Sequence, residues 1–248
     1  MSKGFFVTGT DTGVGKTVVT GALILSLKLL GIRACGMKPI ETGCHKTEGG
    51  RRKAEGRNEE DILSPSDGMF LREIAQTEES LDLITPVRFE NPLAPMAATE
   101  IEGKAVDLGE IKRAFDVLSA KYDAVIVEGI GGLLVPIGKD YFVLNLAKTL
   151  GLPLIVVAKP GLGTLNHTML TVNYAVKEGL NVAGIIINYH RPSEDTIAEE
   201  TNPKILRRIS PVPVIGVFPY LRDFETGTIE KAIVRNLDLE IIRRYMRN

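Results

Sequence analysis

The segment at residues 5–17 constrains the fold of this chain more than any other. A short apolar run leads into a turn of small and polar residues, the turn ends in Gly15-Lys16-Thr17, and a segment rich in Ala, Leu and Val follows. A strand, a glycine-containing turn and a helix in this order are typical of a loop that binds phosphate groups. Gly15 allows the backbone to approach a polyphosphate, Lys16 can reach its β- and γ-phosphates, and the Thr17 hydroxyl can bind Mg²⁺. We call residues 9–17 the phosphate loop.

The spacing of the phosphate loop departs by one residue from the common pattern. Counting back from Gly15, Thr10 stands where the first glycine usually lies, and Gly9 precedes it. An ordinary glycine-rich turn between a strand and a helix is the structural alternative. The position of Gly-Lys-Thr after an N-terminal strand and before a helix favours phosphate binding, because this context distinguishes the motif from a chance match.

Apolar runs alternate with amphipathic segments along the whole chain, with no linker or break in composition. We therefore expect an α/β fold with one domain over residues 1–248, built on a doubly wound, mostly parallel sheet of the P-loop NTPase type. Residues 46–60 are charged and punctuated by glycine, which predicts a mobile loop, and the prolines at 91–96 predict an apolar loop. The predicted strands cover residues 5–7, 33–37, 86–89, 122–128, 154–158, 182–187 and 214–220. The predicted helices include residues 16–30, 107–121 and 228–247.

The composition limits which partners and which cellular compartment we expect for this protein. The 248 residues are 44% hydrophobic and carry a formal net charge of −1. This balance gives no reason to expect a nucleic-acid or membrane partner, and no apolar run is long enough to span a bilayer. Cys35 and Cys44 lack the spacing of a metal or redox motif. With no signal-peptide pattern in the sequence, we expect free thiols and a cytoplasmic protein.

Two charged residues stand at the ends of predicted strands. Lys38, beside Pro39, follows the strand at 33–37. Because ligands bind outside the carboxyl ends of parallel strands, we expect Lys38 to point into the site, although a surface lysine is the usual alternative. Glu128 ends a strongly apolar strand and precedes a run of glycines. An acidic residue at such a position holds Mg²⁺ in P-loop folds, and a buried carboxylate without a cation would be costly.

Two further polar residues are candidates for the same site. Asp67 stands at a predicted helix start, where it is either a simple first-turn charge or a Mg²⁺ ligand. Asn188 ends the strand at 182–187, and its side chain can bind the edge of a base. These two residues complete the set of candidates that the local patterns suggest.

The order of these blocks resembles that of the dethiobiotin synthetases, a family of P-loop enzymes in biotin biosynthesis. The resemblance covers essentially the whole chain, and the family's phosphate loop has the same lengthened spacing. It implies an ATP- and Mg²⁺-dependent ligase that closes a cyclic urea on 7,8-diaminononanoate with CO₂, through a carbamate and a carbamoyl phosphate, and that forms a homodimer. The segments that carry the resemblance are residues 8–12, 14–17, 38–39, 127–129, 131–132, 165–167 and 169–171.

The resemblance also implies roles for individual residues. Lys38 and Lys16 would be catalytic, and Thr17, Asp67 and Glu128 would bind the metal, with Asp61 as an alternative to Asp67. The residues expected to bind the nucleotide are Gly13, Val14, Gly15, Lys16, Thr17, Val18, Asp67, Glu128, Gly129, Ile130, Gly131, Asn188, Tyr189, Pro219, Tyr220 and Leu221. The residues expected to bind the substrate are Thr42 and Gly131 and, across the dimer interface, Gly163, Thr164, Leu165 and Asn166.

Other P-loop classes remain as alternatives. A dimerising switch ATPase of the partition or cell-division type would carry an extra lysine early in the phosphate loop, where this chain has Asp11. Another small-molecule ATP-dependent ligase would share the nucleotide site but use a different acceptor. A cobyrinate-type amide synthetase would need a second, glutaminase domain, for which this chain is too short.

Overall fold

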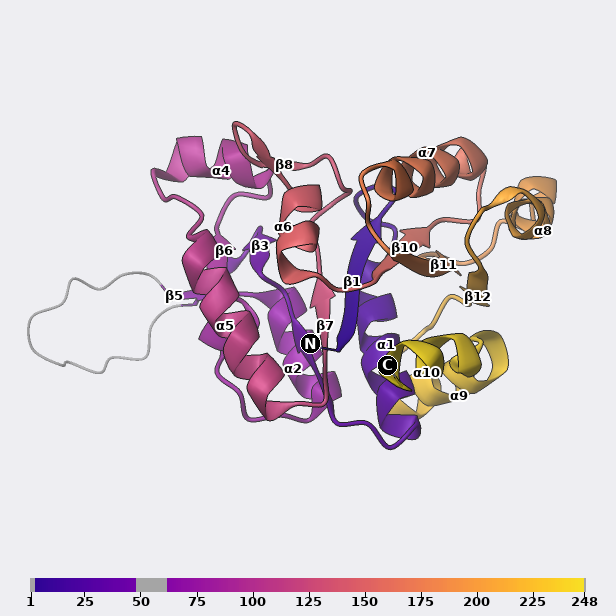
Figure 1. The fold of residues 1–248 in the computed structure, drawn as a ribbon, viewed down its shortest axis with the longest axis horizontal. Helices are drawn as coiled ribbons and strands as arrows, with labels where there is room; N and C mark the ends of the chain where they lie inside the picture. The colour runs from indigo at the N-terminus through magenta and orange to yellow at the C-terminus, as the bar shows by residue number, and fades with distance from the viewer. Residues whose placement is uncertain (1–2, 48–61, 248) are drawn as a thin grey trace, which may run out of the picture.

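The computed structural model describes residues 3–47 and 62–247, which are built around a six-stranded parallel sheet (Figure 1). The strand order is β12-β11-β10-β1-β7-β2, so the first strand of the chain lies in the middle of the sheet. The predicted α/β fold with a parallel sheet is thereby confirmed. The strands are β1 Gly4–Gly9, β2 Ala34–Met37, β7 Ala124–Glu128, β10 Leu154–Ala158, β11 Val182–Asn188 and β12 Val214–Phe218.

Helices cover both faces of the sheet. Side chains alternate between the faces of a strand, so Phe5 and Val7 of β1 join one hydrophobic cluster while Phe6 joins the other. The cluster around Phe5 includes helices α1 Lys16–Leu29, α2 Ser66–Ala75, α9 Thr226–Asn236 and α10 Leu239–Arg247. The cluster around Phe6 includes helices α4 Pro95–Glu102, α5 Leu108–Lys121, α6 Val143–Leu150, α7 Thr164–Lys177 and α8 Ile197–Ile209.

Several short elements lie outside the six-stranded sheet. Strand β3 Ile40–Thr42 follows β2 and Lys38 in the chain and pairs in parallel with β6 Val87–Phe89. A four-residue helix, α3 Leu81–Ile84, precedes β6. The remaining short strands are β4 His45–Thr47, β5 Ile62–Ser64, β8 Pro136–Gly138 and β9 Tyr141–Phe142.

Three local predictions differ from the structure. The predicted loop at 91–96 is wrong at its end, since α4 begins at Pro95, where a proline fits the first helical turn. The predicted single helix at 228–247 is interrupted, because Leu237 leaves the helix to form a β-bridge with Gly216. Residues 46 and 47 belong to strand β4, and the rest of the predicted mobile loop, with Asp61, lies outside the described residues. No helix within residues 3–47 and 62–247 has the length and apolar character needed to cross a membrane.

Candidate active site

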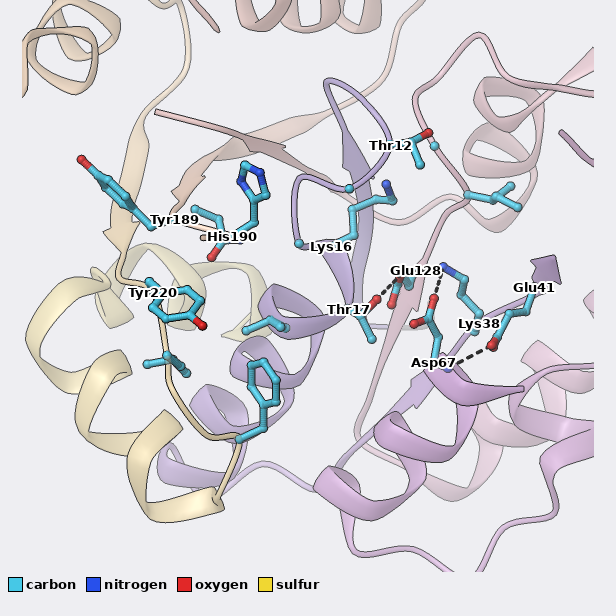
Figure 2. A pocket seen from close by; sticks show the side chains of 18 of the residues that line it. Thr12, Lys16, Thr17, Lys38, Glu41, Asp67, Glu128, Tyr189, His190 and Tyr220 are labelled. Atoms are coloured by element: carbon cyan, nitrogen blue, oxygen red, sulfur yellow. Dashed lines mark hydrogen bonds and ion pairs between the residues drawn. The ribbon is translucent and has the colours of Figure 1, made fainter. Parts of the chain in front are cut away.

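A pocket of about 420 Å³ opens at the carboxyl ends of the central strands, beside the phosphate loop (Figure 2). It is lined by residues from six separate parts of the chain, so the fold assembles it from segments far apart in sequence. The predicted site residues that line this pocket are Gly13, Gly15, Lys16, Thr17, Val18, Lys38, Thr42, Asp67, Glu128, Ile130, Gly131, Asn188, Tyr189, Pro219, Tyr220 and Leu221.

The backbone of the phosphate loop requires glycine at two positions. Gly13 and Gly15 have φ angles of 73° and 84°, in the left-handed region that other residues rarely adopt. A Cβ on Gly15 would also collide with the side-chain amide of Asn188. That amide donates a hydrogen bond of 2.8 Å to the carbonyl of Val14. Asn188 therefore holds the phosphate loop from the end of β11, and Gly15 leaves the space that this contact needs.

The side chain of Lys16 contacts the phosphate loop to which the residue belongs. Its side chain is only 7% exposed, and its Nζ donates a 3.3 Å hydrogen bond to the carbonyl of Asp11. Burial, and after it the positive charge of Lys38, lowers the pKa of Lys16 to about 8. A bound polyphosphate would offset both effects, because its negative charge favours the protonated lysine.

Lys38 is a buried lysine that lies between two carboxylates. Its Nζ lies 2.5 Å from Oε1 of Glu128 and 3.0 Å from Oδ2 of Asp67, and it donates to the carbonyl of Gly129 at 3.3 Å. Burial alone would lower the pKa of Lys38, but the carboxylates of Glu128 and Asp67 more than compensate and hold it above its usual value. The hydroxyl of Thr17 donates to the same Glu128 oxygen at 3.0 Å. Lys38 therefore places its ammonium group at the pocket, between two carboxylates that favour its protonated form.

The residues around Glu128 fit a hard divalent cation. The second carboxylate oxygen, Oε2, is buried and has no hydrogen-bond partner, which is unfavourable for a charged group. Asp67 and Thr17 provide further oxygens within the same pocket (Figure 2), and Mg²⁺ prefers oxygen ligands and keeps several from water or phosphates. The described parts of the chain hold no cluster of three or more His, Cys, Asp or Glu that could bind a metal. The oxygens that Thr17, Asp67 and Glu128 provide are of the type that Mg²⁺ prefers.

Aromatic side chains lie on the opposite side of the pocket from Lys38. Figure 2 shows Tyr189, His190 and Tyr220 together there, while Lys38 and Asp67 occupy the other side. The pocket therefore has a polar, charged end and an aromatic end.

The expected contact of Asn188 with a base edge stays a prediction. Its Nδ2 donates to the carbonyl of Val14, and its Oδ1 is buried and unpartnered.

The remaining predicted site residues do not line this pocket. Val14 and Gly129 take part through their carbonyls, which accept from Asn188 and Lys38. Residues 163–166 begin helix α7, with Gly163 at the N-cap (φ 89°) and Thr164 buried. Their predicted role across a dimer interface does not require them to line the pocket of their own chain.

Four residues of the pocket were missed by sequence reasoning. The most informative is Glu41, which is 3% exposed and accepts hydrogen bonds from the backbone of Asp67 and Gly68. It lies in the segment 38–43 that drew attention to Lys38, but its partners are in a helix that starts 25 residues later. No local pattern connects them. The other three residues are Thr12, His190 and Phe224.

Comparison with known proteins identifies the family. Residues 3–228 match the family model described as AAA domain. The chain is 45% identical to the ATP-dependent dethiobiotin synthetase BioD of Thermodesulfovibrio yellowstonii, over 98% of this chain and 99% of that protein. The chain belongs to this AAA domain family and to the dethiobiotin synthetases. It is also similar to the dethiobiotin synthetases of Bacillus subtilis strain 168 (40% identity, 97% of each chain) and Methanocaldococcus jannaschii (39% identity, 89% and 95%).

Solved structures support the same fold at much lower identity. The cell division protein MinD of Aquifex aeolicus superposes with a TM-score of 0.54 at 14% identity, over 99% of this chain and 98% of that one. MinD of Pyrococcus horikoshii, complexed with Mg-ADP, gives 0.53 at 18% identity, over 99% and 95%. At this identity the likeness shows the fold alone, and it confirms that this dethiobiotin synthetase family member has the predicted P-loop NTPase-like architecture.

Proposed function

We propose that this protein is an ATP-dependent ligase that converts 7,8-diaminononanoate and CO₂ to dethiobiotin, with ADP and phosphate as the other products. The observation that carries the proposal is 45% identity, over nearly the full length of both chains, to an enzyme named ATP-dependent dethiobiotin synthetase. A pocket that joins the phosphate loop to the buried ammonium of Lys38 suits this reaction. The low-identity likeness to MinD concerns the fold and does not favour the switch ATPase.

The proposed reaction proceeds in three steps. One amine of the substrate forms a bond to the carbon of CO₂ and loses a proton, which gives a carbamate. A carbamate oxygen then attacks the γ-phosphorus, and the bond from that phosphorus to the ADP oxygen breaks. Finally the second amine attacks the carbamoyl carbon and loses a proton, phosphate leaves, and the cyclic urea closes. The amines of the substrate are the nucleophiles, so no nucleophilic side chain is needed.

The two lysines serve an electrostatic role in this proposal. The carbamate and the γ-phosphate are both anions, so their approach requires fixed positive charge. Lys16 would bind the phosphates from within the phosphate loop, with the backbone of residues 13–18. Lys38 would face the carbamate, because it lies at the end of another strand and is held by Glu128 and Asp67. Thr42 and Gly131, which line the same pocket, would contact the substrate.

The aromatic end of the pocket would receive the base of ATP. Asn188 and Tyr189 end and follow strand β11, and residues 219–221 follow β12. All of them line the pocket. Tyr189 and Tyr220 lie on the side away from Lys38 (Figure 2). This arrangement supports binding of the base at one end and of the phosphates near Lys16 at the other. Glu128 to Gly131 would then lie beside the phosphates.

Mg²⁺ is the metal proposed for this site, with Thr17, Asp67 and Glu128 as its protein ligands. When bound, the ion would neutralise negative charge on the β- and γ-phosphates. The buried, unpartnered Oε2 of Glu128 supports this assignment, since a cation would satisfy it. Lys38 already neutralises the other carboxylate oxygen, so the protein prepares the site without the ion.

A homodimer would complete the substrate site. Leu134 and Leu170 are 55% and 62% exposed and line an apolar groove beside the phosphate loop. Leu162, just before residues 163–166, is 89% exposed. Burying such side chains against a second copy is favourable, and it would bring residues 163–166 of one chain to the other. Equilibrium sedimentation tests this, since a monomer at micromolar concentration would contradict it.

The proposal also covers the domain organisation and the compartment. We expect residues 1–248 to fold as one domain, which a single cooperative unfolding transition would support. Both cysteines, Cys35 and Cys44, are buried free thiols, which suits the reducing cytoplasm. Fractionation of the native host tests the location.

The decisive experiment measures phosphate release from Mg²⁺ and ATP, with and without 7,8-diaminononanoate and bicarbonate. We expect release only when both are present, with dethiobiotin as the product. Hydrolysis that is indifferent to both additions would favour a switch ATPase instead. No hydrolysis under any of these conditions would indicate a ligase with another acceptor.

A further inference from the structure

We propose that Glu41 is a positioning residue that fixes Asp67 in the site by capping helix α2 from outside the helix. The carboxylate of Glu41 accepts the backbone N–H group of Asp67 at 2.9 Å (Figure 2). It also accepts the N–H group of Gly68 at 3.0 Å and the hydroxyl of Ser66 at 3.3 Å. Glu41 is 3% exposed, so these bonds are shielded from water. The inference rests on the proposed Mg²⁺ site, in which Asp67 is a ligand.

Helix α2 cannot cap its own first turn. The first N–H groups of a helix lack partners within it, and a side-chain oxygen of the N-cap residue usually accepts one of them. The N-cap of α2 is Pro65, which has no such oxygen, and no side-chain cap is made from this position. Glu41 replaces the missing cap with two oxygens, one for each of two consecutive N–H groups. The helix dipole favours a negative charge at this end.

The strand that carries Glu41 is held in place by the sheet beside it. In the β3–β6 pair, Glu41 lies opposite Arg88, and the backbone N–H of Lys38 donates to the carbonyl of Ile84 at 2.7 Å. The first turn of α2 also packs closely against its neighbours, since a Cβ on Gly68 would collide with the Thr85 side chain. One short segment therefore places Lys38 directly and Asp67 through Glu41.

The position of Asp67 is less constrained by its own element than that of Glu128, so it depends more on the Glu41 cap. Glu128 ends a central strand and is 1% exposed, whereas the Asp67 side chain is 34% exposed and lies in the first turn of a helix. Helix ends fray when their N–H groups lack partners. Without the Glu41 carboxylate, the first turn of α2 would loosen and Asp67 would leave its position 3.0 Å from Lys38. The expected result is weaker Mg²⁺ binding, with nucleotide contacts to the phosphate loop intact.

The test compares the affinity for a non-hydrolysable ATP analogue, with and without Mg²⁺, by calorimetry on the full chain. The ratio of the affinity with Mg²⁺ to the affinity without it is called the Mg²⁺ gain. For Glu41→Ala we expect this Mg²⁺ gain to fall about tenfold, which is the usual effect of losing one hydrogen bond to a charged group. The metal-free affinity should stay within about twofold. Asp67→Ala should reduce the Mg²⁺ gain by the same factor. The double variant should lose no more of this gain than either single variant, because both substitutions remove the same metal ligand, Asp67.

Two further variants separate positioning from general stability. Glu41→Gln keeps the shape and one acceptor oxygen, so it should retain an intermediate gain, and this variant also serves if Glu41→Ala does not fold. Glu199→Ala is the matched control: its carboxylate is 6% exposed and accepts N–H groups of Glu194 and Thr196 at the start of α8. It should lower the melting temperature without changing the Mg²⁺ gain.

Several outcomes would overturn the inference. A full Mg²⁺ gain in Glu41→Ala, or in Glu41→Gln where only that variant folds, would show that the cap does not control Asp67. Additive losses in Glu41→Ala and Asp67→Ala would show that the two residues act separately. The proposed metal site itself fails, and this inference with it, if the wild-type protein gains no affinity from Mg²⁺.

Discussion

Lys38 and Glu128 extend from adjacent strands and meet at the pocket, with Nζ of the lysine 2.5 Å from Oε1 of the glutamate. Strands β2 and β7 are paired in parallel with Met37 opposite Val127, so the next residue of each strand emerges at the same edge of the sheet. The register of two strands thus sets the distance between two side chains that are 90 residues apart. Both are nearly inaccessible to solvent, at 4% and 1% exposed.

This relationship predicts that Lys38→Gln separates chemistry from nucleotide binding. Dethiobiotin formation should fall by about 10²-fold or more, the usual effect of removing one preorganised electrostatic group. The affinity for an ATP analogue should change less than about threefold, because the phosphate loop lies on different elements. Calorimetry and product analysis measure the two effects. A folded variant that no longer binds the analogue would contradict this assignment of Lys38.

Lys16→Gln should behave differently, since Lys16 belongs to the phosphate loop. We expect the affinity for ATP to weaken about tenfold, equivalent to 1.4 kcal/mol, together with slower turnover. The dependence of the rate on ATP concentration checks this, with Lys38→Gln as the comparison. Unchanged ATP kinetics would count against the phosphate loop as the nucleotide site.

Gly13 and Gly15 offer a matched pair of alanine substitutions. Both have positive φ angles, at 73° and 84°, so alanine at either position costs about 1–2 kcal/mol of backbone strain. A Cβ on Gly13 meets nothing within 4 Å, whereas one on Gly15 collides with the Asn188 amide. Gly15→Ala should therefore lose nucleotide affinity well beyond Gly13→Ala, because it displaces the amide that holds Val14.

Thermal unfolding and calorimetry on the two glycine variants measure this difference. Backbone strain should destabilise both variants, the clash with the Asn188 amide should destabilise Gly15→Ala further, and only Gly15→Ala should show the additional loss of binding. Equal nucleotide affinities in the two variants would show that the contact between Asn188 and the phosphate loop does not matter for binding.

The two cysteines should resist alkylation in the folded protein. Burial is the first cause that raises the pKa of Cys35 and Cys44, each from 9.0 to about 12. At pH 8 iodoacetamide should therefore react at least about 100-fold more slowly with the native chain than with the chain in guanidinium, since only the thiolate reacts. Mass spectrometry follows the modification. Rapid labelling of Cys44 in the folded protein would contradict its burial.

The same shifts set the sign of a pH effect on stability. Folding favours the protonated thiols, so this contribution is complete below pH 9. Between pH 9 and 12 the unfolded chain releases protons that the folded chain retains, and the free energy of unfolding falls. Cys35→Ala should make this decline shallower, which denaturant titrations at pH 8 and 10 can measure.

Local patterns were sufficient where one segment determines its own structure. Apolar runs predicted β2, β10 and β11 to within one residue at each end, because strands buried on both faces read as continuous hydrophobic stretches. The phosphate loop was recognised because its strand, turn and helix are contiguous. Lys38 and Glu128 were predicted as site residues from their positions at the ends of such strands, and both line the same pocket.

Features that depend on distant contacts were not predicted. The cap on α2 joins Glu41 to Asp67 across the segment between them, and a single glutamate in a strand has no periodicity to reveal it. The break between α9 and α10 follows from the bridge of Leu237 to Gly216, which periodicity along the helix does not contain. The strand order likewise depends on packing between helices and sheet, and so on tertiary structure.

The central place of β1 in the sheet has a consequence during synthesis. Its two neighbours, β7 and β10, begin only at residues 124 and 154, so a nascent chain carries its first strand unpaired until residue 124 has been made, and paired on one side only until β10 follows. The loop contacts that use the carbonyls of Gly131 and Val157 are equally delayed. ATP can stabilise only a chain that already has its site, and a ribosome-bound fragment ending before β10 would gain no protease resistance from the nucleotide.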